Sequence, residues 1–382
     1  MTPRTGAGGA AVLLAALFPA ACLQTKVLPP PPGQTSSGAG GGGGVVSGGG
    51  GTSGTGGAFV GGVGGAGGDS DGGQCPNGPG SPLRLTHSSP TVIFAVDHSA
   101  SMMTTRLPPN NSNRLEVVQA VIKELLPFSD RANFGYLEFP QFDRRGFCSM
   151  NSCCVTNVFL NSPSSIRDAI DRCANAGPGC LSQMDANNTP TVPALNQVND
   201  LFRTLDLRDP QKIVLLLTDH EPASCGSSSD PCDEAAQVIN KLDNTLNVLT
   251  YVVVVGDSVQ NDNGASACLN LMAGASGARR PGPLAYYSAV NEGQVRQAMN
   301  DPVMSSICSA QVEDTFADAS RVVVDIDSQP IPRDPTNTDG WNFTRLTNGR
   351  QAIVFYGEAR KKFLNATDST QIQKVHATVC PH

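Results

Sequence analysis

Three oxygen-bearing side chains alternate directly after the first long apolar run of the folded part of the sequence. Asp97, Ser99 and Ser101 stand at every second position, so a turn here can aim one carboxylate and two hydroxyls at the same point. All three are hard oxygen ligands, which suit Mg²⁺ or Mn²⁺ and do not suit soft metals. Because Asp-x-Ser-x-Ser is a short pattern of common residues, it needs support from elsewhere in the chain.

Further polar residues supply that support. Thr189 and Thr191 form a Thr-Pro-Thr segment that opens a helical pattern, and Asp219 directly follows the apolar run KIVLLLT. Hydroxyl and carboxylate oxygens are again the ligands that a hard cation prefers. His98 and His220 flank these positions, and we expect them to be solvated rim residues. The candidate metal ligands are Asp97, Ser99, Ser101, Thr189 and Asp219.

Strand and helix patterns alternate over the residues that must position these ligands. The expected strands cover residues 91–96, 134–139, 155–160, 212–218, 247–255 and 285–288. The expected helices cover residues 115–125, 164–173, 194–205, 233–242, 265–275 and 292–307, with Thr191 as the N-cap of the third. The link before 155–160 is short and lacks helical periodicity, which indicates an antiparallel edge strand. The alternation predicts an α/β fold, a doubly wound and mostly parallel sheet.

The pattern changes after residue 308. Short strands are expected at residues 321–327, 341–346, 351–356 and 375–379, with Asn348-Gly349 as a hairpin turn. We therefore expect an α/β domain over residues 89–308 and a small, mostly-β C-terminal module over residues 309–382.

The polar positions and the order of elements resemble the metal-ion-dependent adhesion site of von Willebrand factor type A (VWA) domains. The resemblance covers residues 89–308 and includes the antiparallel third strand and Met102 after the second serine. It implies a strand order of 3-2-1-4-5-6, which reverses between strands 1 and 4, where ligands bind in such sheets. Asp97 and Asp219 end those two strands.

The resemblance also implies a role for each ligand. Asp97, Ser99 and Ser101 would hold the metal directly. Thr189 would join directly or through water, and Asp219 would act mainly through water. An Asp or Glu side chain of a partner protein would complete the octahedron.

The amino-terminal residues predict export. Residues 1–22 combine Arg4 with an apolar run that is too short to span a bilayer, followed by small residues and Cys22. This is typical of a signal peptide, and its end resembles a bacterial lipobox with Cys22 as the lipidation site. An ordinary signal peptide is the alternative. The tail resembles that of exported bacterial proteins of this type, with Gly340-Trp341 and a closing Cys380-Pro381.

A low-complexity segment follows the signal. Residues 23–88 are rich in Pro, Gly and Ser, and residues 38–73 alone contain 21 of the 41 glycines. Glycine brings no side chain to bury, so we expect a disordered tether. The protein would then sit in the bacterial cell envelope as an outer-membrane or cell-surface lipoprotein, joined to the membrane by its lipid.

Twelve cysteines fit an exported chain in an oxidising compartment. Proximity in the sequence suggests two local disulfides, Cys173 with Cys180 and Cys225 with Cys232. A zinc site is disfavoured because the chain has no CxxC pair and no histidine near its cysteine cluster at residues 148–154.

Composition and motifs narrow the function. With 33 acidic and 26 basic residues and a formal charge of −7, the chain lacks the basic character that nucleic-acid binding needs. It has no HExxH or Walker motif, so we expect no enzyme. The expected function is metal-dependent binding of a partner protein. The alternatives are a structural envelope protein whose metal only stabilises the fold and a metal-dependent hydrolase.

Overall fold

The computed structural model describes residues 75, 78–87, 89–140, 155, 159–160, 162–174, 189–205, 211–224, 229–314, 318–345, 350–367, 372 and 374–381. Contacts along the chain separate residues 1–67 from residues 68–382, and all of the described residues belong to the second unit.

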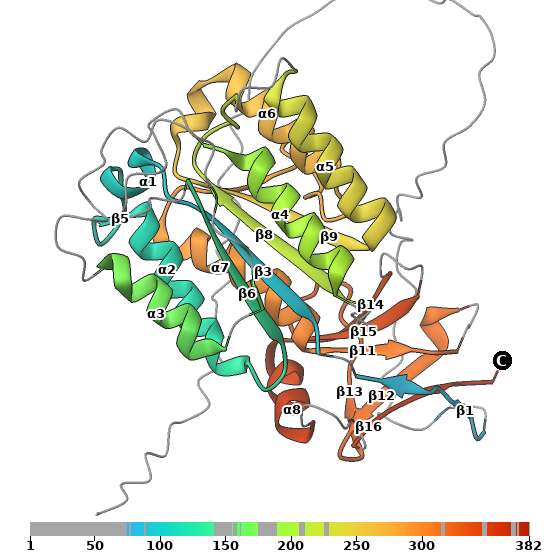
Figure 1. Ribbon diagram of the computed structural model, residues 1–382. Coiled ribbons are helices and arrows are strands. Elements are labelled where there is room, and N and C mark those ends of the chain that lie inside the picture. Colours follow the sequence, from blue (N-terminus) through green and yellow to red (C-terminus); the bar gives the residue numbers. More distant parts are fainter. Residues whose placement is uncertain are drawn as a thin grey trace, which may run out of the picture. The chain divides into compact units, whose positions relative to one another are not determined.

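A six-stranded sheet forms the centre of this unit, in the order β10-β9-β8-β3-β6-β7 (Figure 1). Its strands are β3 (Thr91–Asp97), β6 (Asn133–Phe139), β7 (Phe159–Leu160), β8 (Lys212–Thr218), β9 (Val248–Val255) and β10 (Tyr287–Ala289). All neighbouring pairs are parallel except β6 and β7, which are antiparallel. The predicted doubly wound sheet, its strand order and its antiparallel edge strand are therefore confirmed.

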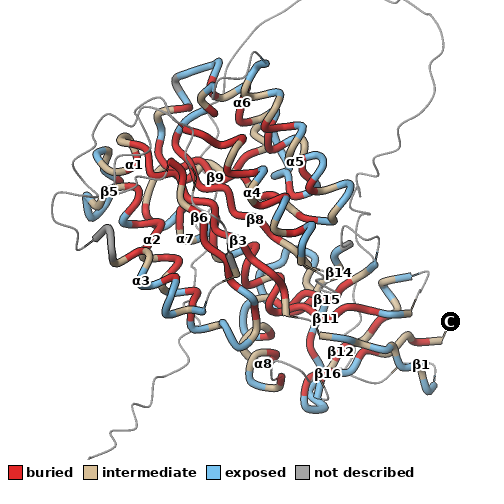
Figure 2. Tube along the Cα trace, viewed as in Figure 1, coloured by how far each residue is buried: buried red, intermediate tan, exposed pale blue. Residues whose placement is uncertain are grey.

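Helices cover both faces of this sheet, as its unbroken apolar strands require. They are α1 (Ala100–Thr104), α2 (Arg114–Leu125), α3 (Pro163–Ala174), α4 (Thr191–Thr204), α5 (Pro231–Leu246), α6 (Asn263–Gly274) and α7 (Glu292–Ile307). Phe94 on one face of β3 packs in a core with α2, α3 and α7. Ile93 on the other face packs in a core with α4, α5 and α6. Figure 2 shows the buried sheet between these layers.

Shorter elements connect the larger ones. They are the hairpin of β4 (Arg106–Leu107) and β5 (Ser112–Asn113), and the 3₁₀ turns η1 (Leu126–Phe128), η2 (Ser258–Asn261) and η3 (Ala319–Arg321). The predicted N-cap of α4 is wrong. Helix α4 begins at Thr191 with Pro190 in the N-cap position, so Thr191 is the first helical residue and not the cap.

Two four-stranded sheets form the C-terminal module, in the orders β1-β16-β12-β13 and β14-β15-β11-β2. Their strands are β1 (Ser81–Pro82), β2 (Leu85–Thr86), β11 (Ser309–Val312), β12 (Val322–Ile326), β13 (Gln329–Ile331), β14 (Gly340–Arg345), β15 (Gln351–Tyr356) and β16 (Val375–Val379). Helix α8 (Gly357–Ala366) was not expected from the sequence. The antiparallel β14–β15 pair is as predicted, and the turn at Asn348-Gly349 lies outside the described residues.

The tether prediction is wrong for its last residues. Strand β1 pairs with β16, and β2 pairs with β11, so the chain just before the central sheet is built into the C-terminal module. Strands of two residues carry too little alternation to be seen in a sequence. The module also shares a core with α7, in which Ile307 and Val303 join the buried Trp341 and Phe355.

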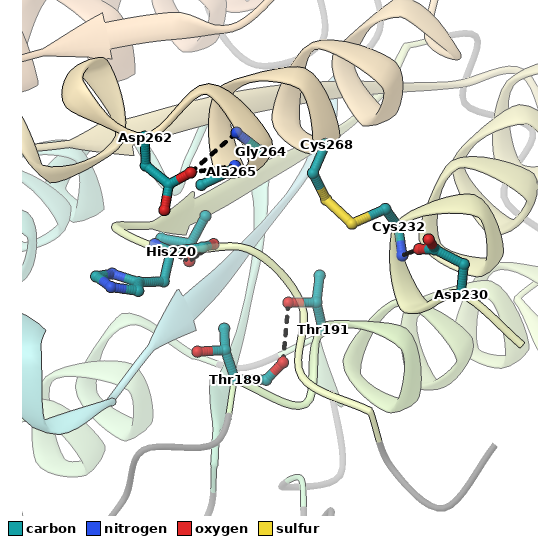
Figure 3. The surroundings of a disulfide bond; sticks show 10 residues. Thr189, Thr191, His220, Asp230, Cys232, Asp262, Gly264, Ala265 and Cys268 are labelled. Atoms are coloured by element: carbon teal, nitrogen blue, oxygen red, sulfur yellow. Dashed lines mark hydrogen bonds between the residues drawn. A yellow bond between two sulfur atoms is a disulfide. The ribbon is translucent and has the colours of Figure 1, made fainter. Parts of the chain in front are cut away.

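Two disulfides lie among the described residues. Cys232 of α5 pairs with Cys268 of α6 at a Cα–Cα distance of 5.4 Å (Figure 3), so the predicted Cys225–Cys232 pair is wrong. Cys75 pairs with Cys380, which fastens the start of the described chain to its end. Cys22, Cys180 and the side chain of Cys173 lie outside the described part of the structure. Among the described helices, none has the length and hydropathy of a membrane span.

Candidate metal centre

Four of the five predicted ligands meet at the carboxyl edge of the central sheet. Asp97 ends β3, and Asp219 directly follows its parallel neighbour β8. Ser99 precedes α1 and Ser101 lies within it. The Ser101 hydroxyl donates to Asp219 Oδ1 at 3.0 Å, and the Ser99 and Ser101 hydroxyl oxygens lie 3.1 Å apart. Residues more than 100 positions apart thus form one cluster of oxygens.

Thr189 reaches the same edge through its backbone. Its carbonyl oxygen accepts the backbone N–H of Ala223 at 2.9 Å and that of Thr191 at 2.7 Å. The first bond ties the start of α4 to the segment that follows Asp219. Figure 3 shows Thr189 and His220 near the disulfide between α5 and α6, with the Thr191 hydroxyl bonded to the Thr189 carbonyl. The side chain of Thr189 makes none of the hydrogen bonds seen between the other four ligands.

Asp97 is fully buried and held by two donors. Its Oδ1 accepts the backbone N–H of Ser99 at 2.8 Å, and its Oδ2 accepts the hydroxyl of Thr218 at 2.7 Å. These bonds fix the orientation of the carboxylate. Thr218, the last residue of β8, is a contributor that sequence analysis missed, because a Thr at the end of an apolar run carries no distinguishing signal.

Arg114 is the second missed residue, and it is the main departure from the expected site. Its Nη1 donates to Asp219 Oδ2, and its side chain is 2% exposed. The expected role of Asp219 was contact through water, whereas in the structure this carboxylate has a guanidinium partner. The sequence holds one related signal, the glycine at position 256, which leaves space for the Arg114 side chain. Gly256 directly follows β9 with φ +101°, and a Cβ there would collide with the Arg114 guanidinium.

The two carboxylates have opposite electrostatic environments. Burial, reinforced by the nearby Asp219 charge, raises the pKa of Asp97 to about 7. Burial alone would also raise the pKa of Asp219, but the hydrogen bond from His220 and the Arg114 guanidinium lower it overall. Asp219 is therefore already neutralised by protein groups, and Asp97 is the carboxylate whose negative charge lacks a cationic partner among the described residues.

The two flanking histidines differ from each other. His220 is half-exposed and its Nδ1 lies 3.4 Å from Asp219 Oδ1, which raises the pKa of its imidazole. His98 is buried, with its Nε2 3.7 Å from Glu138 Oε1 and 3.5 Å from Gln119 Nε2. The expectation that both are solvated rim residues is therefore wrong for His98, which is buried beside Glu138 and Gln119.

The donor set fits a hard divalent cation. The cluster presents only oxygen atoms, from carboxylates and hydroxyls, and its buried Asp97 charge is one that a cation would stabilise. No group of three His, Cys, Asp or Glu side chains in the described part of the chain forms an alternative metal cluster. Asp97, Ser99 and Ser101 are the residues that would hold Mg²⁺ or Mn²⁺.

Solved structures with similar folds include three of low sequence identity. Proximal thread matrix protein 1 from the mussel byssus is 17% identical, with a TM-score of 0.38 over 60% of this chain and 51% of that one. The pilus adhesin SpaC from Lactobacillus rhamnosus GG, in its open conformation, is 14% identical, with a TM-score of 0.43 over 79% of this chain and 40% of that one. The conserved hypothetical protein BatB from Bacteroides thetaiotaomicron is 15% identical, with a TM-score of 0.37 over 57% of this chain and 98% of that one.

This chain thus spans about half the length of the mussel protein and less than half that of the adhesin. No curated protein sequence matches it. The sequence profile of the von Willebrand factor type A domain matches residues 91–299, which is more than half of the 382 residues. Together with the strand order and the cluster at the ends of β3 and β8, this match shows that the chain belongs to the von Willebrand factor type A family.

Proposed function

We propose that this protein is an envelope-tethered binding module that uses Mg²⁺ or Mn²⁺ to capture an acidic side chain of a partner protein. Domains of this family commonly act in adhesion and protein binding. The observation that carries the proposal is the Ser101–Asp219 contact of 3.0 Å beside the buried Asp97, because it gathers hard oxygen ligands at the edge where such sheets bind ligands.

Each residue contributes in a different way. The Asp97 carboxylate supplies the charged ligand, held in place by Thr218 and the Ser99 N–H. The hydroxyls of Ser99 and Ser101 supply neutral ligands. A bound divalent cation would present an open, electron-poor coordination position, and a carboxylate is the hard anionic ligand that suits it. Binding therefore needs no nucleophile and no general base from this chain.

We expect the whole chain to bind an immobilised peptide whose only charged side chain is one glutamate. Binding should require Mg²⁺ or Mn²⁺ and should be lost on adding a chelator, because the carboxylate bonds to the metal. A peptide with glutamine in place of glutamate is the matched control. Surface plasmon resonance measures both, and equal binding of the two peptides would rule out capture through an acid.

The alternative is a metal that only stabilises the fold. The buried Asp97 charge favours this possibility, since any cation there would stabilise the folded state. Circular dichroism with and without chelator separates the two functions. Loss of peptide binding with the fold retained supports the binding module, whereas unfolding on chelation without any peptide binding supports the structural role.

The envelope tether is a further part of the proposal. Cys22 would carry the lipid, and the tether would reach the folded unit at Cys75, which is bonded to Cys380. The length of a glycine-rich coil would let the binding site extend away from the membrane. The site would thus be presented to partners at the outer membrane or cell surface.

Replacing Cys22 with Ser should release the protein from the membrane fraction, because serine cannot accept the lipid through a thioether. Fractionation followed by immunoblotting measures the release. Cys75→Ser is the matched control and should leave the protein with the membrane, since Cys75 is engaged with Cys380. Unchanged fractionation of the Cys22 variant, with unmodified Cys22 by mass spectrometry, would contradict the lipoprotein proposal.

A further inference from the structure

Arg114 is positioned rigidly at the first turn of helix α2. A capping box fixes this turn, in which Asn113 Oδ1 accepts the Glu116 N–H at 2.7 Å and Glu116 Oε2 accepts the Asn113 N–H at 3.1 Å. From this turn the guanidinium reaches Asp219 Oδ2 while Ser101 holds Oδ1. Oδ2 of Asp219 thus faces a permanent cation, and Oδ1 faces the hydroxyl cluster and His220 Nδ1.

The surroundings of Arg114 are built to accept a buried cation. Its Nη1 lies 3.5 Å from the Ser258 hydroxyl, which itself donates to the Asp219 carbonyl at 3.0 Å. Its Nη2 lies 3.8 Å from Asp257, whose side chain is 76% exposed and therefore screened by solvent. Gly256 leaves the room that the guanidinium fills.

Burying Arg114 in this way is unfavourable if its only role is to stabilise the fold. The Nε of Arg114 is buried without a hydrogen-bond partner in the described structure. A buried guanidinium with an unsatisfied donor carries a desolvation cost that an apolar side chain of similar size would avoid. A buried ion pair is therefore weak evidence for a stabilising role, and its contact with Asp219 points to a role in the site.

We propose that Arg114 sets the charge of the metal-loaded site and thereby its preference for an acidic partner. This inference rests on the proposed function. With both carboxylates ionised and His220 neutral, Asp97, Asp219 and Arg114 together carry one negative charge, so a divalent cation leaves the loaded site with one positive charge. Without Arg114 the same site is neutral when loaded, and its attraction for an incoming carboxylate falls. Arg114 weakens metal binding and strengthens acid binding.

The test replaces Arg114 with Gln in the whole chain. Calorimetry with Mg²⁺ alone should show at least about tenfold tighter binding, because a buried positive charge next to the site is removed and Asp219 is released. The Mg²⁺-loaded variant should bind the single-glutamate peptide about tenfold more weakly, for the same electrostatic reason. A change of opposite sign in the two affinities is a readout that a merely structural role does not produce.

Two further variants serve as controls. Arg106→Gln removes an exposed positive charge on β4, whose guanidinium donates only to the Asn111 carbonyl among the contacts shown, and it should change neither affinity. Arg114→Lys keeps the charge and loses the planar fork, so both affinities should stay within about threefold of the wild type. Because Arg114→Gln leaves Asp219 buried without its cation, its unfolding is measured with and without Mg²⁺, and we expect Mg²⁺ to restore stability.

The outcomes distinguish this inference from the function beneath it. Tighter Mg²⁺ binding with weaker peptide binding supports it. If both affinities fall in Arg114→Gln, or if Arg114→Lys behaves like Arg114→Gln, the charge of Arg114 does not set the preference and the inference is wrong. If the wild-type chain binds neither ion, the metal-dependent function itself fails.

Discussion

Asp97→Asn is expected to abolish Mg²⁺ binding in calorimetry, with an affinity loss of at least about 100-fold, while the chain stays folded. Asparagine keeps the shape of the side chain and its Oδ1 acceptor for the Ser99 N–H, which lies 2.8 Å away. It removes the one carboxylate of the site that has no cationic partner among the described residues, and two serine hydroxyls cannot balance a divalent cation. Peptide binding should be lost together with metal binding.

Asp219→Asn is the matched comparison, since it makes the same chemical change on the neighbouring strand. It leaves the Arg114 guanidinium, 2% exposed, without its carboxylate. Breaking one side of a buried ion pair typically costs about 3–5 kcal/mol of unfolding free energy. Urea denaturation followed by circular dichroism should therefore show a much larger loss of stability for Asp219→Asn than for Asp97→Asn.

This pair of variants tests the division of labour between the two acids. If Asp97→Asn still binds Mg²⁺ as the wild type does, the ligand assignment is wrong. If both variants lose the same amount of unfolding free energy, the Arg114–Asp219 ion pair does not contribute more to stability than the bonds of Asp97 do. Both measurements use the purified variants and Mg²⁺ alone, so they need no knowledge of the natural partner.

The central sheet was predictable because its strands are buried on both faces. Residues 212–218 form β8 with the bounds that the apolar run indicated, and residues 292–307 form α7 as expected. An unbroken apolar run followed by a polar residue marks both the strand and the site at its end. For this reason Asp97 and Asp219 could be placed at one edge before the fold was known.

Contacts between distant elements could not be predicted in the same way. The Cys232–Cys268 disulfide joins two helices that pack side by side, and nearness in sequence favoured Cys225 instead. Arg114 resembles any arginine at the start of an exposed amphipathic helix, and only the fold shows that it turns inward to Asp219. Both errors arise because helix packing, not local sequence, decides which side chains meet.

The binding of Mg²⁺ should weaken steeply below pH 7. Burial beside Asp219 raises the pKa of Asp97 to about 7, and only its ionised form can bind a cation. The proton must be displaced at pH 5.5 but not at pH 8, so the apparent affinity should be about 30-fold weaker at pH 5.5. The pKa of His220 is also raised by its bond to Asp219, and its protonation adds repulsion of the same sign.

The metal-free protein should show the reverse dependence in its stability. Asp97 binds its proton more tightly in the folded chain, with a pKa of about 7, than at its ordinary value of 3.8. The contribution of this group is therefore favourable at low pH and is lost as the pH rises through 7. Saturating Mg²⁺ offsets the destabilising effect of the buried, ionised Asp97. The increase in melting temperature on adding Mg²⁺ should therefore be larger at pH 8 than at pH 5.5.

Calorimetry and thermal melts at the two pH values test both statements, and His220→Gln separates the two titrating groups. Because Asp97 would bind the metal directly and His220 would not, most of the 30-fold change expected from the pKa of Asp97 should persist in the His220 variant. Loss of the pH dependence in that variant would assign it to the imidazole instead. Equal Mg²⁺ affinities at pH 5.5 and pH 8 in the wild type would show that Asp97 is ionised throughout, and that its burial is compensated by its bonds to Thr218 and the Ser99 N–H.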